Sequence, residues 1–574
     1  RSVVYWSSGG EARLFTAVQS FIYALDARTG KVISSFGKDG RIDLRENLGR
    51  DPEKQSIVET TPGIIYKDLL IVGDRTPEAL PAPPGDIRAY DVRTGALRWT
   101  FHTIPHPGEP GYETWPKDAW TYTGAANNWA GMAVDEKRGI VYVPTGSAAS
   151  DFYGADRIGD NLYANCLLAL NAQTGERIWH FQAVKHDVWD RDFPSPPTLV
   201  TVKRDGKSID AVAQTTKQGW VFLFDRTDGK LLFPVEYKKY PPSTTPGEVT
   251  SETQLLPTNP APFARQLLTA DMLSNRTPEI HQWALEKFRT LRSEGQFVPF
   301  GVGQETVIFP GFDGGAEWGG SAFDPETALL YVNANDVVWT SSLAPNVDGT
   351  AGRPLYLSNC AGCHGDNLQG APPQFPALSD LRGRRTPREI AAVIRQGGGR
   401  MPSFPNLSTE AATSIAQFIL SGEVKELAPA ETSKENPKYR FTGYHKFQDP
   451  DGYPAVAPPW GTLNAINLNT GEYAWKIPFG EYPELGANTG TENYGGPVVT
   501  AGGLVFIAAT NFDRKFHAFD KLTGKLLWES TLPLSGNATP ITYELAGRQY
   551  VVIYATGGKS GGVSGGIYVA FALP

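Results

Sequence analysis

One short pattern recurs six times along the chain and constrains its fold more than any other feature. The pattern is Ala-x-Asp/Asn-x-x-Thr-Gly-x-x-x-Trp or a slight variant, with its acidic or amide position at Asp26, Asp91, Asn171, Asp225, Asn467 and Asp520. Each copy predicts a strand, a tight turn and a second strand that ends in a large side chain. Repeated units that each bury an aromatic residue against the next indicate a β-propeller.

The composition agrees with an all-β protein, because 61 glycines, 45 prolines and 14 tryptophans accompany short β-type runs. Successive copies lie 53 to 80 residues apart, except for 242 residues between Asp225 and Asn467. That gap has room for one more blade, around residues 321–336, and for a separate domain.

The gap contains a CxxCH motif, Cys360-Ala361-Gly362-Cys363-His364. Two thiols at this spacing can bond to the vinyl groups of a haem while the adjacent imidazole binds the iron. A zinc site would need further Cys or His ligands, and the only other cysteine, Cys166, is almost two hundred residues away. We therefore predict a c-type haem, bound covalently by Cys360 and Cys363 with His364 as an axial ligand.

A second axial ligand is expected from Met401, which lies 41 residues past Cys360 in a glycine-rich loop. Thr386 and Ser408 each precede an amphipathic helical stretch, which is the pattern of an N-cap. On the CAGCH motif, the Met-Pro loop and the terminal helix, residues 349–426 resemble a class I cytochrome c domain. Residues 427–437 are expected to form a linker, with propeller segments at 1–348 and 438–574.

The remainder of the chain resembles the PQQ-dependent quinoprotein dehydrogenases of the glucose, polyol and alcohol branch. The resemblance lies in the tryptophan repeats and in WDRDFPSPPTLV, TTKQGWVFLFDR and GGPVVTAGGLVFIAAT. It implies an all-β, eight-bladed β-propeller, into which the small all-α cytochrome c domain is inserted within or between blades. The chain would then be a quinohaemoprotein that contains pyrroloquinoline quinone (PQQ) and haem c.

The family's catalytic positions match Asp190 and Lys217. Asp190 would be the base that accepts the substrate's hydroxyl proton, and Lys217 would contact the quinone oxygens and stabilise their negative charge. Considered in isolation, Asp190 is better explained as a turn or blade-edge carboxylate, and a solvated strand-end cation is the alternative for Lys217.

The resemblance also assigns the quinone pocket. Trp129 would form its floor by stacking, and Arg1 would bind a cofactor carboxylate. Asn493 and Tyr494 would cover the reactive edge, while Glu317 stands where the family often has asparagine.

Calcium is the implied metal, bound by Glu78, Asp190 and a third residue. The family's asparagine position is Ser147 here, and Asp192, water or another chain oxygen would compensate for the weaker hydroxyl ligand. An acid at Asp192 also occurs in lanthanide-using relatives, so a lanthanide or Mg²⁺ stays possible.

The function implied is oxidation of an alcohol, polyol or sugar, with primary alcohols, sorbose and glucose as examples. Electrons would pass from reduced PQQ to haem c and on to an external acceptor, a soluble cytochrome c or a quinone. Two alternatives stay open: a non-catalytic periplasmic propeller scaffold with a cytochrome, and a cytochrome-propeller nitrite reductase. The latter would need a second haem with distal histidines in the propeller.

Charge and hydropathy bear on partners and compartment. The formal net charge of −8 makes nucleic acid an unexpected partner. No run of 18 apolar residues is present, so no transmembrane segment is predicted. The sequence shows no signal peptide and begins at Arg1, as expected of a processed or truncated product, and haem attachment is compatible with a periplasmic location.

Overall fold

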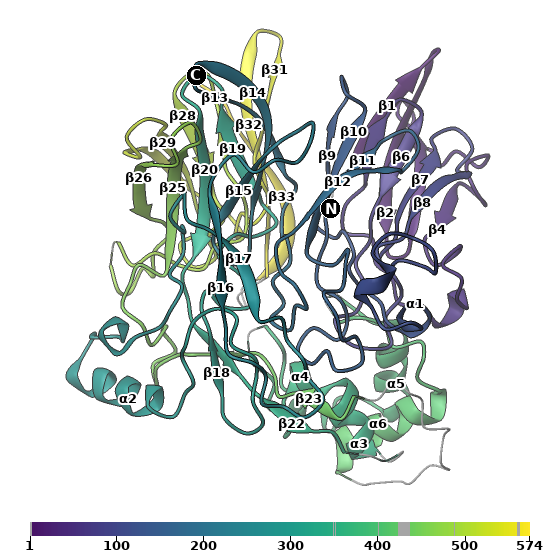
Figure 1. Ribbon diagram of the computed structural model, residues 1–574, viewed down its shortest axis with the longest axis vertical. Helices are drawn as coiled ribbons and strands as arrows, with labels where there is room; N and C mark the ends of the chain where they lie inside the picture. The colour runs from purple at the N-terminus through teal and green to yellow at the C-terminus, as the bar shows by residue number, and fades with distance from the viewer. Residues whose placement is uncertain are drawn as a thin grey trace.

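The computed structural model describes residues 3–347, 349, 352–372, 374–399, 401–422, 437–486, 488–558 and 563–573. Strands dominate these residues, and most of the helices gather at one end of the molecule (Figure 1). Arg1 and all of the expected linker except Pro437 lie outside the described residues.

Among the described residues, eight antiparallel sheets have three or four strands, and seven of them follow one another in chain order. The first three contain β1 (Val3–Ser8), β2 (Glu11–Val18), β3 (Phe21–Asp26) and β4 (Arg41–Asp43), then β5 (Ile64–Tyr66), β6 (Leu69–Val72), β7 (Ile87–Asp91) and β8 (Leu97–Phe101), then β9 (Ala133–Asp135), β10 (Ile140–Pro144), β11 (Cys166–Asn171) and β12 (Arg177–Gln182). The fourth contains β13 (Thr198–Arg204), β14 (Lys207–Thr215) and β15 (Val221–Asp225).

The remaining three of these sheets use strands from the second half of the chain. They contain β19 (Ser321–Asp324), β20 (Leu329–Asn335), β25 (Gly461–Asn467) and β26 (Tyr473–Pro478), then β27 (Val498–Val499), β28 (Leu504–Ile507), β29 (Lys515–Asp520) and β30 (Leu526–Thr531), then β31 (Ile541–Leu545), β32 (Arg548–Gly557) and β33 (Ser564–Phe571). The first strands β1, β5, β9, β13, β19 and β27 contact one another in succession, as the inner strands of a propeller do. The eighth blade stays a prediction.

Three tryptophans of the repeat, Trp99, Trp179 and Trp475, join one sheet to the next. The Trp99 indole donates a hydrogen bond to the Ala172 carbonyl and packs on Gly175, where a Cβ would lie 2.5 Å from the ring. Trp179 does the same with the Arg226 carbonyl and Gly229. Because Gly175 and Gly229 have φ of +77° and +72°, glycine suits both the turn and the close approach.

Trp475 repeats this contact with the Lys521 carbonyl and Gly524. The repeat thus predicted correctly both the hairpins and the residues that join them. The aspartates cap the turns: Asp91 accepts bonds from the amides of Arg93 and Thr94, both at 2.9 Å.

One sheet contains strands from before and after the segment that holds the CxxCH motif. β20 pairs with β25 from Leu329↔Asn467 to Asn335↔Gly461, so more than a hundred residues lie between neighbouring strands. The prediction of an extra blade around residues 321–336 is therefore wrong: β19 and β20 share one sheet with β25 and β26, which carry the repeat at Asn467. Two smaller sheets flank the CxxCH segment. One contains β18 (Thr306–Ile308), β21 (Trp339–Ser341) and β24 (His445–Lys446), and the other pairs β22 (Leu343–Pro345) with β23 (Tyr439–Phe441).

The described residues between β22 and β23 form a helical segment. It contains α3 (Gly352–Asn359), α4 (Ala361–His364), the 3₁₀ turn Ser379–Leu381, α5 (Pro387–Gln396) and α6 (Thr409–Ser421). Thr386 caps α5 in a capping box with Glu389, and Ser408 caps α6, as the sequence predicts. The short helices α3 and α4 were not predicted, and they complete an apolar core that includes Cys360, Ile394 and Phe418.

Further short elements lie between the sheets. Residues 235–288 contain the hairpin of β16 (Val235–Lys239) and β17 (Thr253–Pro257), the 3₁₀ turn Ala270–Met272 and α2 (Pro278–Phe288). The others are α1 (Ala119–Tyr122) and the 3₁₀ turns Pro52–Lys54 and Tyr112–Thr114. Across the described part of the chain, no helix has the length and apolar character needed to cross a membrane.

Candidate active site

The loop that joins β12 to β13 carries the central carboxylates of the site. His186 and Asp190 take positive φ of 46° and 55° there, an uncommon conformation for residues other than glycine. The buried His186 imidazole lies 2.7 Å from the Glu248 carboxylate. This contact anchors the loop at one end and helps to hold the unusual backbone.

Asp187 fixes the middle of this loop. Its carboxylate accepts four hydrogen bonds, from the amides of Trp189 (2.9 Å) and Arg191 (2.7 Å), from Asn165 Nδ2 (2.8 Å) and from the Ser147 hydroxyl. A buried carboxylate that accepts this many hydrogen bonds rigidifies the groups that it joins. Asp187 is therefore a scaffold residue of the site.

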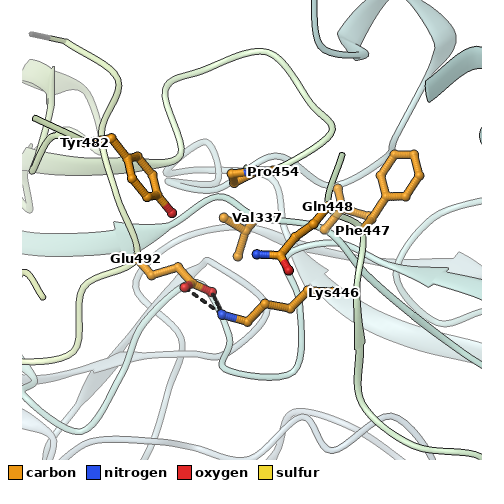
Figure 2. Close-up of a pocket in the computed structure, with 8 residues that line it drawn as sticks. Val337, Lys446, Phe447, Gln448, Pro454, Tyr482 and Glu492 are labelled. Atoms are coloured by element: carbon orange, nitrogen blue, oxygen red, sulfur yellow. Dashed lines mark hydrogen bonds and ion pairs between the residues drawn. The ribbon is translucent and has the colours of Figure 1, made fainter. Parts of the chain in front are cut away.

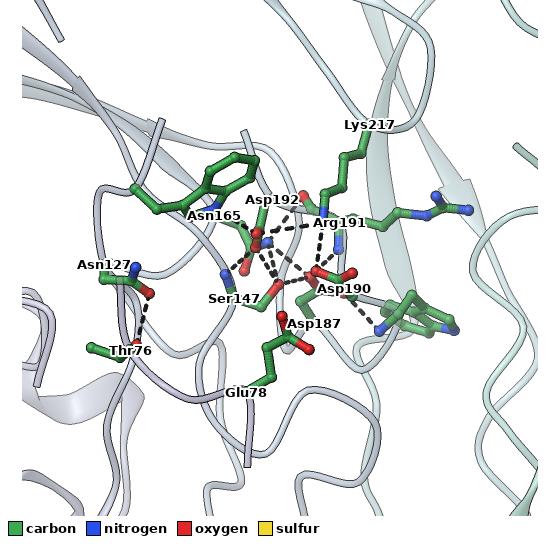
Figure 3. Close-up of polar contacts among 12 residues, drawn as sticks. Thr76, Glu78, Asn127, Ser147, Asn165, Asp187, Asp190, Arg191, Asp192 and Lys217 are labelled. Carbon is green, nitrogen blue, oxygen red and sulfur yellow. Dashed lines mark hydrogen bonds and ion pairs between the residues drawn. The ribbon is translucent and has the colours of Figure 1, made fainter. Parts of the chain in front are cut away.

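Asp192 is held in a similar way (Figure 3). It accepts bonds from the Ser147 amide (2.6 Å) and hydroxyl (2.9 Å) and from the Trp129 indole (2.8 Å). Although burial alone would raise the pKa of Asp192, the charge of Lys217 and these hydrogen bonds lower it. Ser147, predicted as a metal position, thus places its hydroxyl between Asp187 and Asp192, which share its single proton.

Lys217 stands on the turn between β14 and β15, and its Nζ contacts Asp190 Oδ1 at 2.7 Å and Asp192 Oδ2 at 3.5 Å. Burial alone would lower the pKa of Lys217, but the charges of Asp190 and Asp192 raise it well above its usual value. The ammonium also lies 5.9 Å from the centroid of the Trp129 ring. The structure therefore brings together Asp190, Lys217, Trp129, Ser147 and Asp192.

Asp151 joins this cluster, although no sequence pattern predicted it. It lies on the loop after β10 and is only 3% exposed, and no hydrogen bond to its carboxylate occurs among the described residues. Burial, and then the charges of Asp190, Glu78 and Asp192, raise the pKa of Asp151 well above its usual value. Its only signal in the sequence is an acid four residues after Ser147.

Glu78 is aimed at the same cluster from the loop after β6 (Figure 3). Its charge contributes to the raised pKa of Asp190, but its carboxylate accepts a hydrogen bond of 2.7 Å from the Tyr444 hydroxyl. Glu78 therefore lies next to the expected metal position and is engaged, in this structure, by a residue from beyond the helical segment.

The residues expected to cover the quinone come from two further regions. Tyr494 is buried, donates to Asp313 Oδ2 (3.0 Å) and stacks on Trp318 at 5.5 Å. Asn493 does not project freely, because its side chain is bonded to Asn333 and to backbone carbonyls. Glu317 is buried, and its charge contributes to the raised pKa of Tyr494.

A small cleft lies beside this cover. Glu492, adjacent to Asn493, holds Lys446 Nζ with both carboxylate oxygens at 2.7 Å, and Tyr482, Val337 and Phe447 complete the walls (Figure 2). The Lys446 ammonium also lies 5.2 Å from the Trp339 ring centroid.

The CxxCH residues share one helical turn. Cys360 is buried in the apolar core of the helical segment, where burial raises the pKa of its thiol to about 12. Burial lowers the pKa of His364, and its Nδ1 lies 2.9 Å from the Pro376 carbonyl. A neutral imidazole that donates from Nδ1 presents Nε2 to an iron. Met401 packs against the same core.

The residues fit the cofactors expected of them. Among the described residues, no three His, Cys, Asp or Glu groups converge as a formed metal site. Asp151, however, is a buried carboxylate without a donor, beside Asp190 and Glu78, and hard oxygen ligands of this kind suit a divalent cation. The Trp129 indole and the Lys217 ammonium, 5.9 Å apart, suit a flat quinone, since the ring can stack on the indole and its carbonyl oxygens can face the ammonium.

Comparison with known families agrees with this geometry. The profile of the PQQ family, described as the β-propeller domain of glucose, ethanol and alcohol dehydrogenases, matches residues 1–366 and 400–551. The chain belongs to this family of quinoprotein propellers. A second profile, that of the cbb3-type cytochrome c oxidase subunit III, matches residues 347–419 and thus covers the CxxCH segment.

Curated relatives cover nearly the whole chain. The quinoprotein glucose dehydrogenase of Escherichia coli K12 is 31% identical over 96% of this chain and 62% of its own length. The glycerol dehydrogenase large subunit of Gluconobacter oxydans is 31% identical over 93% of the chain and 66% of its own length. The chain thus spans slightly less than two thirds of these relatives, which are named as oxidoreductases.

Among solved structures, the quinohemoprotein alcohol dehydrogenase of Comamonas testosteroni is similar, with a TM-score of 0.61 and 21% identity over 100% of this chain and 66% of that one. This likeness supports the β-propeller fold.

Proposed function

We propose that this chain is a PQQ-dependent quinohaemoprotein dehydrogenase that oxidises an alcohol, a polyol or a sugar. The observation that carries the proposal is the buried Asp190–Lys217 pair beside the Trp129 ring, in a member of the PQQ family that also contains CxxCH. The names of the relatives, which include glucose, glycerol and alcohol dehydrogenases, support this substrate class.

Asp190 is the proposed base. Lys217 occupies its Oδ1, so Oδ2 is the atom that accepts the substrate's hydroxyl proton. PQQ, when bound, supplies an electrophilic carbonyl that accepts the hydride. Lys217 places a positive charge where negative charge builds up on the quinone oxygens, and Trp129, fixed through Asp192, forms the platform under the ring.

Calcium, when bound, would supply a Lewis acid beside Asp190. We assign its ligands to Asp190, Glu78 and Asp151, while Ser147 and Asp192 position the loop by the hydrogen bonds described above. This assignment adds Asp151 to the predicted set and gives Ser147 and Asp192 a supporting part. Mg²⁺ or a lanthanide would use the same oxygens.

Residues 349–426 are proposed to bind haem c through Cys360 and Cys363, with His364 and Met401 on the iron; the match to a cytochrome profile supports this. The propeller would comprise residues 1–348 and 438–574, joined through a linker at 427–437. Electrons would leave through the haem to a soluble cytochrome c or a quinone, and the covalent haem favours a periplasmic location.

The test uses the haem-loaded chain reconstituted with PQQ and calcium. A panel of alcohols, polyols and sugars is added, and the haem α-band and the quinone absorbance are followed. At least one substrate should reduce both the quinone and the haem of the wild-type protein. In the Asp190→Asn variant the same substrate should reduce them about 10²–10⁴-fold more slowly. Absence of quinone reduction with every substrate and with calcium, magnesium and lanthanide alike would overturn the proposal.

A further inference from the structure

Tyr444 lies at the seam between the strands and the helical segment. It follows Gly443, where an added Cβ would lie 3.1 Å from the carbonyl of Gly362, inside the CxxCH motif. Arg440 donates two hydrogen bonds, of 2.8 and 2.6 Å, to the carboxylate of Asp366, two residues past the motif. Tyr444 is therefore held close to the haem-attachment residues.

From Tyr444 an unbroken series of contacts runs in both directions. Its hydroxyl donates to Glu78 Oε2 at 2.7 Å, and its ring stacks on Phe375 with centroids 5.6 Å apart at 21°. Phe375 directly precedes Pro376, whose carbonyl lies 2.9 Å from His364 Nδ1. The series thus joins a residue of the quinone and metal site to the proposed iron ligand.

Electrostatics places the same side chain between the two sites. Burial, and then the charges of Glu78, Cys363 and Asp190, raise the pKa of Tyr444 well above its usual value. Both the proposed base and a haem-binding cysteine are thus near enough to act on this phenol. The phenol also stays protonated, and remains a donor to Glu78, at ordinary pH.

We propose that Tyr444 is the coupling side chain through which electrons pass from the quinone site to the haem. The inference rests on the proposed function. Oxidation of one substrate hydroxyl to a carbonyl releases two electrons and two protons. The electrons would pass one at a time to the single haem iron, each reducing Fe(III) to Fe(II), and the external acceptor would reoxidise the iron between the two transfers. The protons would leave by way of Asp190 to solvent. Tyr444 is neither oxidised nor deprotonated. Its side chain provides the packed atoms between Glu78 and Phe375, and without them the electronic coupling between quinone and haem would be weaker.

Three variants test this assignment. Tyr444→Leu removes the ring and breaks the series, whereas Tyr444→Phe keeps the ring and loses only the bond to Glu78. Phe300→Leu is the matched control, because Phe300 belongs to the same aromatic cluster, through Phe152, Phe312 and Phe441, and stands outside the series. The control shows what loss of a buried ring costs in general.

Single-turnover mixing with substrate resolves reduction of the quinone from reduction of the haem. Pulse radiolysis supplies electrons without any organic substrate, and the rate at which they redistribute between quinone and haem absorbances is measured. We expect Tyr444→Leu to slow transfer to the haem by about tenfold or more by both methods, and Tyr444→Phe to change it by less than about threefold. Quinone reduction by substrate and the haem midpoint potential should stay unchanged.

Wild-type transfer rates in Tyr444→Leu, or equal slowing in Phe300→Leu, would overturn the assignment. So would a shifted haem potential that accounts for the slower rate. Failure of all substrates to reduce the quinone would count against the proposed function alone, because pulse radiolysis still measures transfer between the two cofactors.

Discussion

The two sides of the acidic site differ in how their carboxylates are satisfied. Asp187 and Asp192 receive hydrogen bonds from backbone amides, the Ser147 hydroxyl and the Trp129 indole. On the other side, Asp151 has no donor among the described residues, and Asp190 has the Lys217 ammonium. A buried carboxylate without donors is costly, so the first side is suited to hold the site's shape and the second to bind a cation and react.

The strongest test of this comparison is Asp190→Asn. The amide oxygen can still accept from Lys217, so the site should keep its shape and bind PQQ, but the base is gone. Quinone reduction by substrate should fall by about 10²–10⁴-fold, measured in single turnover with the bound quinone quantified by its absorbance. Activity within a factor of a few of wild type would assign the base elsewhere.

Asp151→Asn should weaken calcium without unfolding the chain. Loss of one charged oxygen ligand is expected to lower calcium affinity by about 10–100-fold, measured by calorimetric titration of the PQQ-loaded protein. Asp118→Asn, at the residue that directly precedes the short helix α1, serves as a control for loss of charge. An unchanged calcium affinity would remove Asp151 from the metal site.

Asp187→Asn should show the opposite balance. Its amide nitrogen cannot accept the bonds that the carboxylate receives, so the free energy of unfolding should fall by about 1–3 kcal/mol, measured by denaturant titration of the metal-free protein. Calcium affinity, corrected for the folded fraction, should change less than in Asp151→Asn. The reverse ranking of the two variants would contradict the division of the site.

The smallest effect concerns pH in the metal-free protein. Because the pKa of Asp151 is raised in the folded state, the folded chain holds more protons than the unfolded chain above the ordinary value of 3.8, and stability falls as pH rises through that window. Asp151→Asn should remove this loss, so its advantage in unfolding free energy over wild type should grow from pH 5 to pH 8. Saturating calcium should abolish the advantage.

Local patterns in the sequence predicted the parts of the fold that local patterns determine. The Asp/Asn-Thr-Gly turns, the docking of Trp99, Trp179 and Trp475 on the next repeat, and the caps of α5 and α6 are all found. The pairing of β20 with β25 could not be predicted, because it joins strands separated by the helical segment.

The candidate site divides in the same way. Asp190 and Lys217 stand in distinctive segments and are found in contact. Asp151 has significance only because tertiary burial leaves it without a donor, and the contact between Glu78 and Tyr444 joins residues 366 positions apart. Neither the missing donor at Asp151 nor the contact between Glu78 and Tyr444 can be predicted from a periodicity or a motif in the sequence.

The ends of the helical segment leave from two strands that already pair with each other, with Pro345 opposite Tyr439 in β22 and β23. A tight turn could therefore replace everything between them without unpairing a strand of the propeller. The helical segment therefore has the geometry of a separable insert: it begins and ends at one pair of strands, and its removal would leave the pairing of β22 with β23 in place.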